Sequence, residues 1–177
     1  MQDVIIIESK PPGINYIMYA PNRKTNLIER IVDNTKQPYE YEMLLTMANE
    51  LCHINPKKNK TILDIGMNIG NHALFFAARG NRVIGIEANP KMSAIAKKSV
   101  EINAFEDKIK IIECGVSDKD EILYFKEEIP ENFGAMHLET KGQGQEIKCR
   151  RIDYLGINEE ICLLKMDIEG MEAPALR

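Results

Sequence analysis

Residues 61–72 form a glycine turn between a predicted strand and a predicted helix, and they contain the first candidate ligand-binding groups. The candidates are Asp64, Gly66, Asn68, Gly70 and Asn71. Glycine allows the backbone to turn tightly and to approach a ligand without an intervening Cβ. The helix that follows would point its unpaired N–H groups at the same place. The pattern therefore predicts a site for a nucleotide-like cofactor.

The spacing and charge of this turn favour S-adenosylmethionine over NAD. A dinucleotide fingerprint reads G-x-G-x-x-G, whereas this chain has Asn68 and Asn71 at the second and third glycine positions. Asp64 would repel a pyrophosphate but would attract the ammonium and sulfonium groups of S-adenosylmethionine. We expect S-adenosylmethionine as the cofactor, and an NAD-dependent enzyme remains an alternative.

A second acidic residue follows at the end of the next predicted strand, residues 82–87. Glu87 lies about 20 residues after the glycine turn, where a carboxylate can accept hydrogen bonds from both ribose hydroxyls. Asn89, at the start of the next helix, is assigned to the same site. The alternative is that Asp64 and Glu87 only cap the helices that follow them.

The stretch 161–172 contains a third group of charged candidates. Lys165, Asp167 and Glu169 alternate with apolar residues, which places them on one face of a strand near its carboxyl end. One interpretation is an ion pair between Lys165 and a carboxylate, and the other is the polar floor of an active site. We favour the active site, with Asp167 as the base or the group that orients the acceptor. Mg²⁺ bound by these carboxylates is a weaker alternative, since no spacing requires a metal.

Four motifs, in this order, resemble the FkbM-type family within the class I S-adenosylmethionine-dependent methyltransferases. They are ILDIGMNIGNHALFFA, VIGIEANP, GVSD at 115–118 and LLKMDIEGMEAPAL, and the resemblance covers residues 38–177. It implies that adenine binds near Gly115 and Val116, and the family shares the K-x-D-x-E-G-x-E pattern. Residues 39–42 resemble the family's segment at the cofactor cleft, although we assign them to helix-dipole interactions and packing. An N/D-P-P-aromatic turn, typical of enzymes that methylate base amines, is absent from this place.

The elements that must position these residues form an α/β fold. We expect a doubly wound Rossmann-like methyltransferase sheet with strand order 3-2-1-4, built from strands near 61–65, 82–87, 109–112 and 161–166. Short β segments at 122–126, 135–139 and 146–152 predict an antiparallel insertion. Residues 1–37 are expected to form peripheral strands and a helix, and residues 38–177 the methyltransferase-like domain. The family's strands after the fourth are missing, so we expect a C-terminally truncated chain whose exposed fourth strand could mediate self-association.

Composition limits the possible partners. The net charge of −4 argues against nucleic acid, and no apolar run reaches the length of a membrane span. The four cysteines lack metal-site spacing and are interpreted as reduced core thiols, which favours the cytoplasm. We expect O-methylation of a small-molecule, sugar or lipid-linked hydroxyl. The alternative is a truncated module that binds the cofactor without catalysis.

Overall fold

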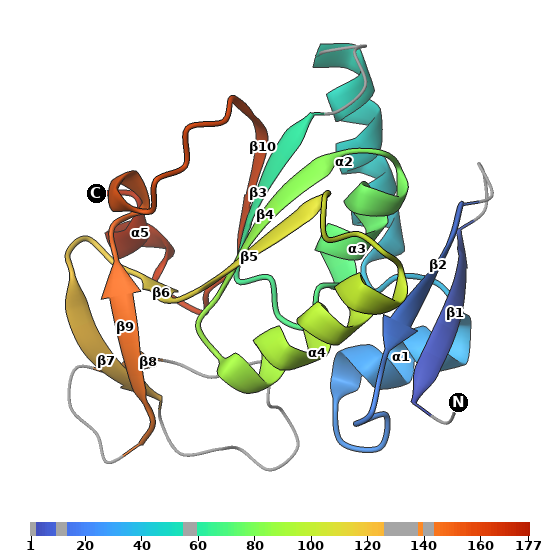
Figure 1. Cartoon of the computed structure of the whole chain (residues 1–177), viewed down its shortest axis with the longest axis horizontal. Coiled ribbons are helices and arrows are strands. Elements are labelled where there is room, and N and C mark those ends of the chain that lie inside the picture. The colour runs from blue at the N-terminus through green and yellow to red at the C-terminus, as the bar shows by residue number, and fades with distance from the viewer. Residues whose placement is uncertain (1–2, 10–13, 55–59, 126–137, 140–143) are drawn as a thin grey trace.

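A four-stranded parallel sheet lies at the centre of the protein (Figure 1). The structure is a computed structural model that describes residues 3–9, 14–54, 60–125, 138–139 and 144–177. The strands are β3 (Thr61–Ile65), β4 (Arg82–Glu87), β5 (Ile109–Glu113) and β10 (Ile161–Met166), in the order β10-β3-β4-β5. This order confirms the prediction that the first strand of the sheet lies between the second and the fourth.

One face of this sheet packs against helices. Ile62 and Val83 point into the main hydrophobic cluster, which also contains α3 (Asn71–Ala78) and much of α4 (Pro90–Ile102). The helices α1 (Leu27–Thr35) and α2 (Tyr41–Ile54) precede the sheet in the chain and contribute to the same cluster. α3 is apolar throughout because it is buried between the sheet and other elements.

The opposite face packs against less regular structure. Leu63 and Ile84 alternate with the residues of the helix-covered face and belong to a second cluster. The segment that covers it includes a 3₁₀ turn, Ile152–Tyr154, and the short helix α5 (Glu172–Ala175). The sheet is therefore covered on both sides, which fits strands that are apolar at almost every position.

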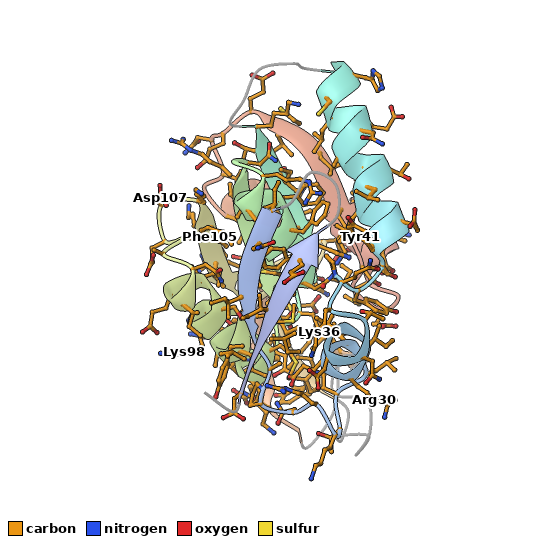
Figure 2. The ribbon with its side chains drawn as sticks, turned by 90° about the vertical axis from the view of Figure 1, so that its right-hand side faces the viewer. Arg30, Lys36, Tyr41, Lys98, Phe105 and Asp107 are labelled. Atoms are coloured by element: carbon orange, nitrogen blue, oxygen red, sulfur yellow. The ribbon has the colours of Figure 1, made fainter. Side chains whose placement is uncertain are left out.

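The N-terminal strands form a hairpin that packs on the helices of the main cluster (Figure 2). β1 (Val4–Ser9) pairs antiparallel with β2 (Ile14–Tyr19). The N–H of Ile17 donates to Asn103 Oδ1 at 2.8 Å, and the N–H of Tyr19 donates to Ser99 Oγ at 2.9 Å. The hairpin thus contributes to the main core rather than lying loosely at the periphery. The division of the chain near residue 37 stays a prediction.

A second sheet stands beside the first and confirms the predicted antiparallel insertion. It contains β6 (Gly115–Val116), β7 (Glu121–Phe125), β8 (Leu138–Glu139) and β9 (Glu146–Arg150), in the order β6-β9-β7-β8. β7 is antiparallel to β8 and β9, while β6 is parallel to β9. Part of the predicted strand at 135–139 lies outside the described residues. Because β6 follows β5 directly, the two sheets meet next to the carboxyl ends of the parallel strands.

Two expectations about the surface have different outcomes. Cys114 and Cys149 are buried, but Cys52 is exposed and is therefore not a core thiol.

β10 is the outermost strand of the described parallel sheet, and its Leu164 is 44% exposed, so self-association through this edge stays a prediction. In the described part of the chain, no helix combines the length and apolar character needed to cross a membrane.

A buried carboxyl stabilises the start of α1. Asn26 caps the helix by accepting from the N–H of Glu29, and the side chain of Glu29 accepts from the N–H of Asn22. Glu29 is fully buried, and this burial raises its pKa to about 7. The charged form of Glu29 is therefore unfavourable in the folded protein.

Glu29 makes the stability of the fold depend on pH. Its folded-state pKa lies above the unfolded value of about 4.3, so between these values the folded chain binds more protons and stability falls as pH rises. We expect Glu29→Gln to be more stable than wild type at pH 8 by about 1 to 3 kcal/mol, with little difference at pH 4.5. Urea unfolding at several pH values measures this, with exposed Glu106→Gln as the control. The prediction would be contradicted if the free energy of unfolding changed equally with pH in wild type and in Glu29→Gln.

Candidate cofactor and acceptor site

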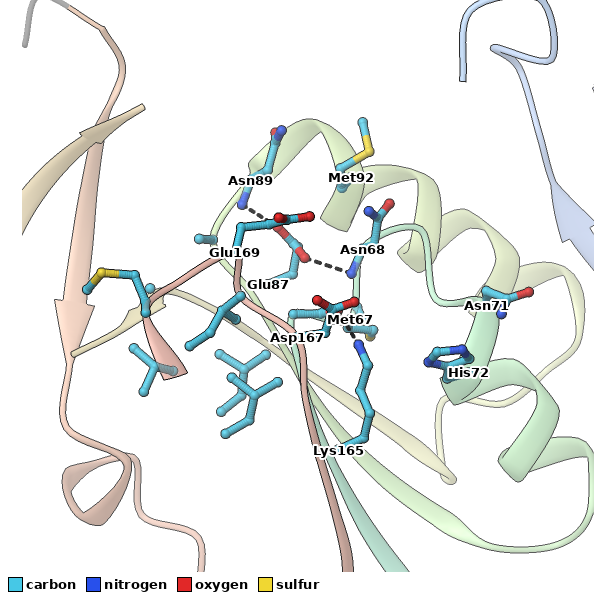
Figure 3. Close-up of a pocket in the computed structure, with 18 of the residues that line it drawn as sticks. Met67, Asn68, Asn71, His72, Glu87, Asn89, Met92, Lys165, Asp167 and Glu169 are labelled. Carbon is cyan, nitrogen blue, oxygen red and sulfur yellow. Dashed lines mark hydrogen bonds between the residues drawn. The ribbon is translucent and has the colours of Figure 1, made fainter. Parts of the chain in front are cut away.

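A cavity of about 290 Å³ lies at the carboxyl ends of β3, β4 and β10. Figure 3 shows Glu87 and Asn89 on one side of Asp167, and Asn71 and His72 on the other. Most of the predicted site residues border this cavity: Gly66, Asn68, Asn71, Glu87, Asn89, Gly115, Val116, Lys165, Asp167 and Glu169. Asp64 and Gly70 are not among the bordering residues and lie behind them. The prediction that Gly66, Glu87 and Asp167 meet at one sheet edge is confirmed.

The glycine turn is closely packed against neighbouring backbone. Gly66 has a φ of +76°, and a Cβ there would lie 1.9 Å from the carbonyl oxygen of Asp167. Met67 passes over Gly85 of β4, where a Cβ would lie 2.1 Å from the Met67 sulfur. The N–H groups of Gly66 and Met67 both donate to the carbonyl of Ile86, at 2.9 and 3.0 Å. Glycine at position 66 is therefore required by backbone packing as well as by the turn, and Gly85 leaves room for the Met67 side chain.

Glu87 presents a buried carboxylate to the cavity. Oε2 accepts from the N–H of Asn68 and Oε1 from the N–H of Asn89, each at 2.7 Å. Burial raises the pKa of this carboxyl, whereas the two N–H groups act in the opposite direction. Each carboxylate oxygen still has lone-pair capacity for a ligand. Glu87 can therefore accept hydrogen bonds from a ligand diol, as predicted for the ribose.

Lys165 forms an ion pair with Asp64 below the cavity. The two residues are register partners on β10 and β3, and Lys165 Nζ lies 3.2 Å from Asp64 Oδ1. The same Nζ donates to the carbonyl of Gly66 at 2.8 Å. Asp64 is only 1% exposed, so its charge depends on this cation. The ion-pair alternative for Lys165 is thus realised, with Asp64 as the carboxylate, while Lys165 still borders the cavity.

Asp167 and Glu169 lie in the turn that follows β10, because the strand ends at Met166. The N–H of Asp167 donates to the carbonyl of Ile65 at 3.0 Å, which keeps this turn beside β3. Glu172 closes the turn by accepting from the N–H groups of Ile168 and Gly170. Within the described residues, the Asp167 side chain has no hydrogen bond or ion pair. Its exposed carboxylate is available to a ligand.

Among the further residues that border the cavity are Tyr39, Glu40 and His72, which were not predicted from the sequence as site residues. Asn71 joins the first of them to α3, because its side chain accepts from the N–H of Tyr39 and donates to its carbonyl, both at 2.9 Å. His72 Nε2 lies 3.2 Å from Glu40 Oε2. The assignment of residues 39–42 to helix-start packing alone was therefore incomplete.

The chemistry of these groups fits S-adenosylmethionine. The Glu87 acceptors and the close backbone at Gly66 suit a ligand with a diol, and the Glu87 and Asp167 carboxylates at the cavity suit a cationic centre. Among the described residues, no group of three or more His, Cys, Asp or Glu side chains could hold a metal ion, so the structure gives the Mg²⁺ alternative no support.

The parallel sheet, its glycine turn and the acidic residue after the next strand define the class I methyltransferase fold. A family model described as the Methyltransferase FkbM domain matches residues 64–177. The chain belongs to this FkbM methyltransferase family.

Individual relatives are more distant. The chain is 23% identical over 171 residues to the 23S rRNA (uracil(1939)-C(5))-methyltransferase RlmD of Nitrosospira multiformis, covering 87% of this chain and 39% of that protein. It thus spans well under half the length of this curated relative.

Two solved structures are also similar to the chain. A putative S-adenosyl-L-methionine-dependent methyltransferase from Methanococcus maripaludis matches 49% of this chain and 39% of its own, with 17% identity and a TM-score of 0.39. The tRNA (uracil-54, C5)-methyltransferase of Pyrococcus abyssi, in complex with S-adenosyl-L-homocysteine, matches 66% of this chain and 25% of its own, with 20% identity and a TM-score of 0.39.

The close approach at Gly66 predicts a site-specific loss of stability. Both Gly66→Ala and the control Gly80→Ala place alanine at a positive φ, which costs about 1 to 2 kcal/mol. Only the new Cβ of Gly66→Ala would also overlap neighbouring backbone, since no atom lies within 4 Å of a Cβ at Gly80. We expect Gly66→Ala to be at least about 2 kcal/mol less stable than Gly80→Ala in urea unfolding. Equal losses would contradict the packing described for the turn.

The ion pair predicts opposite results for single and double substitutions. Lys165→Met leaves the buried Asp64 uncompensated and should destabilise the fold by about 3 to 5 kcal/mol. Adding Asp64→Leu should restore most of this loss, because an apolar pair needs no partner. Asp167→Asn, at an exposed carboxylate, should change unfolding free energy by less than about 0.5 kcal/mol. A large loss in Asp167→Asn would show that this residue stabilises the fold instead.

Proposed function

We propose that this chain uses S-adenosylmethionine to methylate a hydroxyl group on a small-molecule, sugar or lipid-linked acceptor. The observation that supports it most is the single cavity bordered by Glu87, the glycine turn and Asp167. In this proposal Glu87 binds the ribose hydroxyls, Gly66 to Asn71 surround the amino-acid part, and Gly115 and Val116 contact adenine. When bound, the cofactor supplies a methyl group on a sulfonium.

The charges around the cavity support this assignment. Glu40, Glu87, Asp167 and Glu169 all border it, whereas Lys165, the one lysine that borders it among the described residues, is already paired with Asp64. A site with this excess of carboxylates favours a cationic cofactor and a neutral or cationic acceptor. It disfavours the phosphate backbone of a nucleic acid, which proteins bind through uncompensated lysines and arginines.

Methyl transfer from a sulfonium is an in-line displacement, so the protein acts mainly by orienting the acceptor. We assign Asp167 the role of accepting a hydrogen bond from the acceptor hydroxyl, because its side chain is exposed at the cavity and has no hydrogen bond or ion pair with the described residues. Lys165 and Glu169 would shape the polar surface around it. RNA as the acceptor is the second candidate, because the relative from Nitrosospira multiformis is named for rRNA methylation.

Binding measurements test the cofactor assignment directly. We expect calorimetric binding of S-adenosylhomocysteine and of 5′-methylthioadenosine, which retains adenine and ribose but lacks the amino-acid part. Glu87→Gln should weaken both by about 10- to 100-fold, since both ligands share the ribose. The control is Glu113→Gln, at the register partner of Glu87 on β5. Stabilisation by NAD instead, in a thermal-shift comparison, would favour the dehydrogenase alternative.

The acceptor class can be tested without knowing the acceptor. The protein is incubated with methyl-labelled S-adenosylmethionine and either a metabolite and lipid extract or total RNA, and products are identified by mass spectrometry. We expect label on a hydroxyl oxygen in the extract. Transfer to RNA alone would refute the hydroxyl assignment, and cofactor binding without any transfer would favour the non-catalytic module.

A further inference from the structure

His72 is a buried imidazole in the wall of the cavity. It is the second residue of α3 and is 7% exposed. Its Nε2 atom is buried, and among the described residues it has no aligned hydrogen bond but lies 3.2 Å from the carboxylate oxygen Oε2 of Glu40. A buried imidazole beside a carboxylate in the wall of a ligand cavity calls for a functional explanation.

Glu40 lies beside this imidazole because two contacts hold its segment to α3. The Asn71 side chain forms two hydrogen bonds with the backbone of Tyr39, one residue before Glu40. Glu40 itself adopts a φ of +58°, an unusual conformation for a residue that is not glycine. The resulting distance from His72 Nε2 to Glu40 Oε2 is 3.2 Å.

The charged groups around His72 come from four places outside α3. Asp64 lies near the end of β3, Lys165 on β10, Asp167 in the turn after β10, and Glu40 before α2. The carboxylates of Asp64, Glu40 and Asp167 favour a positive charge on the imidazole, whereas Lys165, which is paired with Asp64, opposes it. Figure 3 shows that His72 and Asp167 lie on the same side of Glu87, away from Asn89.

We propose that His72 accepts the proton of the acceptor hydroxyl during methyl transfer, and that Glu40 positions its imidazole for this role. The inference rests on the proposed function and refines it, because Asp167 then orients the hydroxyl instead of removing its proton. A neutral imidazole with its proton on Nε2, toward Glu40, has a lone pair on Nδ1.

The proposed step is balanced in atoms and charge. The hydroxyl oxygen forms a bond to the transferred carbon, the carbon–sulfur bond breaks with its electrons going to sulfur, and the proton passes to His72. The positive charge thus moves from sulfonium to imidazolium, where Glu40 stabilises it. Burial lowers the pKa of His72, with Lys165 acting in the same direction and Asp64, Glu40 and Asp167 acting against it. His72 is therefore neutral and ready to accept a proton near pH 7.

The test compares His72→Gln and Glu40→Gln with exposed controls on α2, His53→Gln and Glu42→Gln. In the labelled-extract assay, His72→Gln should lower transfer by about 100-fold or more. Glu40→Gln should lower methyl transfer less than His72→Gln does. In a plot of transfer against pH, the decline on the acid side should move to lower pH. Affinity for S-adenosylhomocysteine should stay within about threefold of wild type in both, as expected for residues that act on the acceptor.

A second measurement tests the role of Glu40 without relying on methyl transfer. NMR titration of the His72 ring, assigned by its absence in His72→Gln, should show a pKa below the ordinary histidine value that falls further in Glu40→Gln. An unchanged titration in Glu40→Gln would overturn the positioning role.

Other outcomes separate this inference from the proposed function. Full transfer by a folded His72→Gln, or a loss of S-adenosylhomocysteine affinity that matches the loss of transfer, would overturn the role of His72 alone. If the melting temperature of His72→Gln is well below that of wild type, His72→Asn is used in its place. Absence of transfer by the wild-type protein would overturn the proposed function itself.

Discussion

The buried carboxylate of Asp64 imposes the main constraint on this site. A charge that is 1% exposed requires a close cation, and Lys165, its register partner on β10, supplies one. The same ammonium holds the carbonyl of Gly66, so it fixes the first residue of the glycine turn. This one ammonium therefore joins β10 to β3 and to the first residue of the glycine turn.

The acidic residues of the site divide into different roles according to burial. Asp64 neutralises Lys165 inside the protein, Glu87 is fixed by two backbone N–H groups and faces the cavity, and Asp167 is exposed. The sequence analysis assigned Asp64 to the methionine end of the cofactor. In the structure it stands one layer deeper, so it can act on a ligand only through Lys165 and through the potential of the site.

The sequence alone was sufficient for the parallel sheet, because its signals are local. Apolar strands, the glycine turn and acidic strand ends each occur within a few consecutive residues, and right-handed crossovers leave few arrangements for them. The contributions of Tyr39, Glu40 and His72 could not be read in this way. They depend on the contact of Asn71 with a residue 32 positions away, which has no local pattern. The hairpin was judged peripheral for the same reason, since Ser99 and Asn103 hold it from a distant helix.

The junction of the two sheets limits how freely this protein could be modified. Gly115 lies both in the cavity wall and in β6, and a Cβ there would lie 2.4 Å from the sulfur of Cys149 on β9. Many enzymes diversify by exchanging an inserted segment while the scaffold stays constant. Here the insertion shares a wall with the cavity, so it is not an independent module. A chimera that imports another family member's β7 to β9 would need a matching residue opposite Gly115, and recombination that ignores this junction would change cofactor affinity together with acceptor choice.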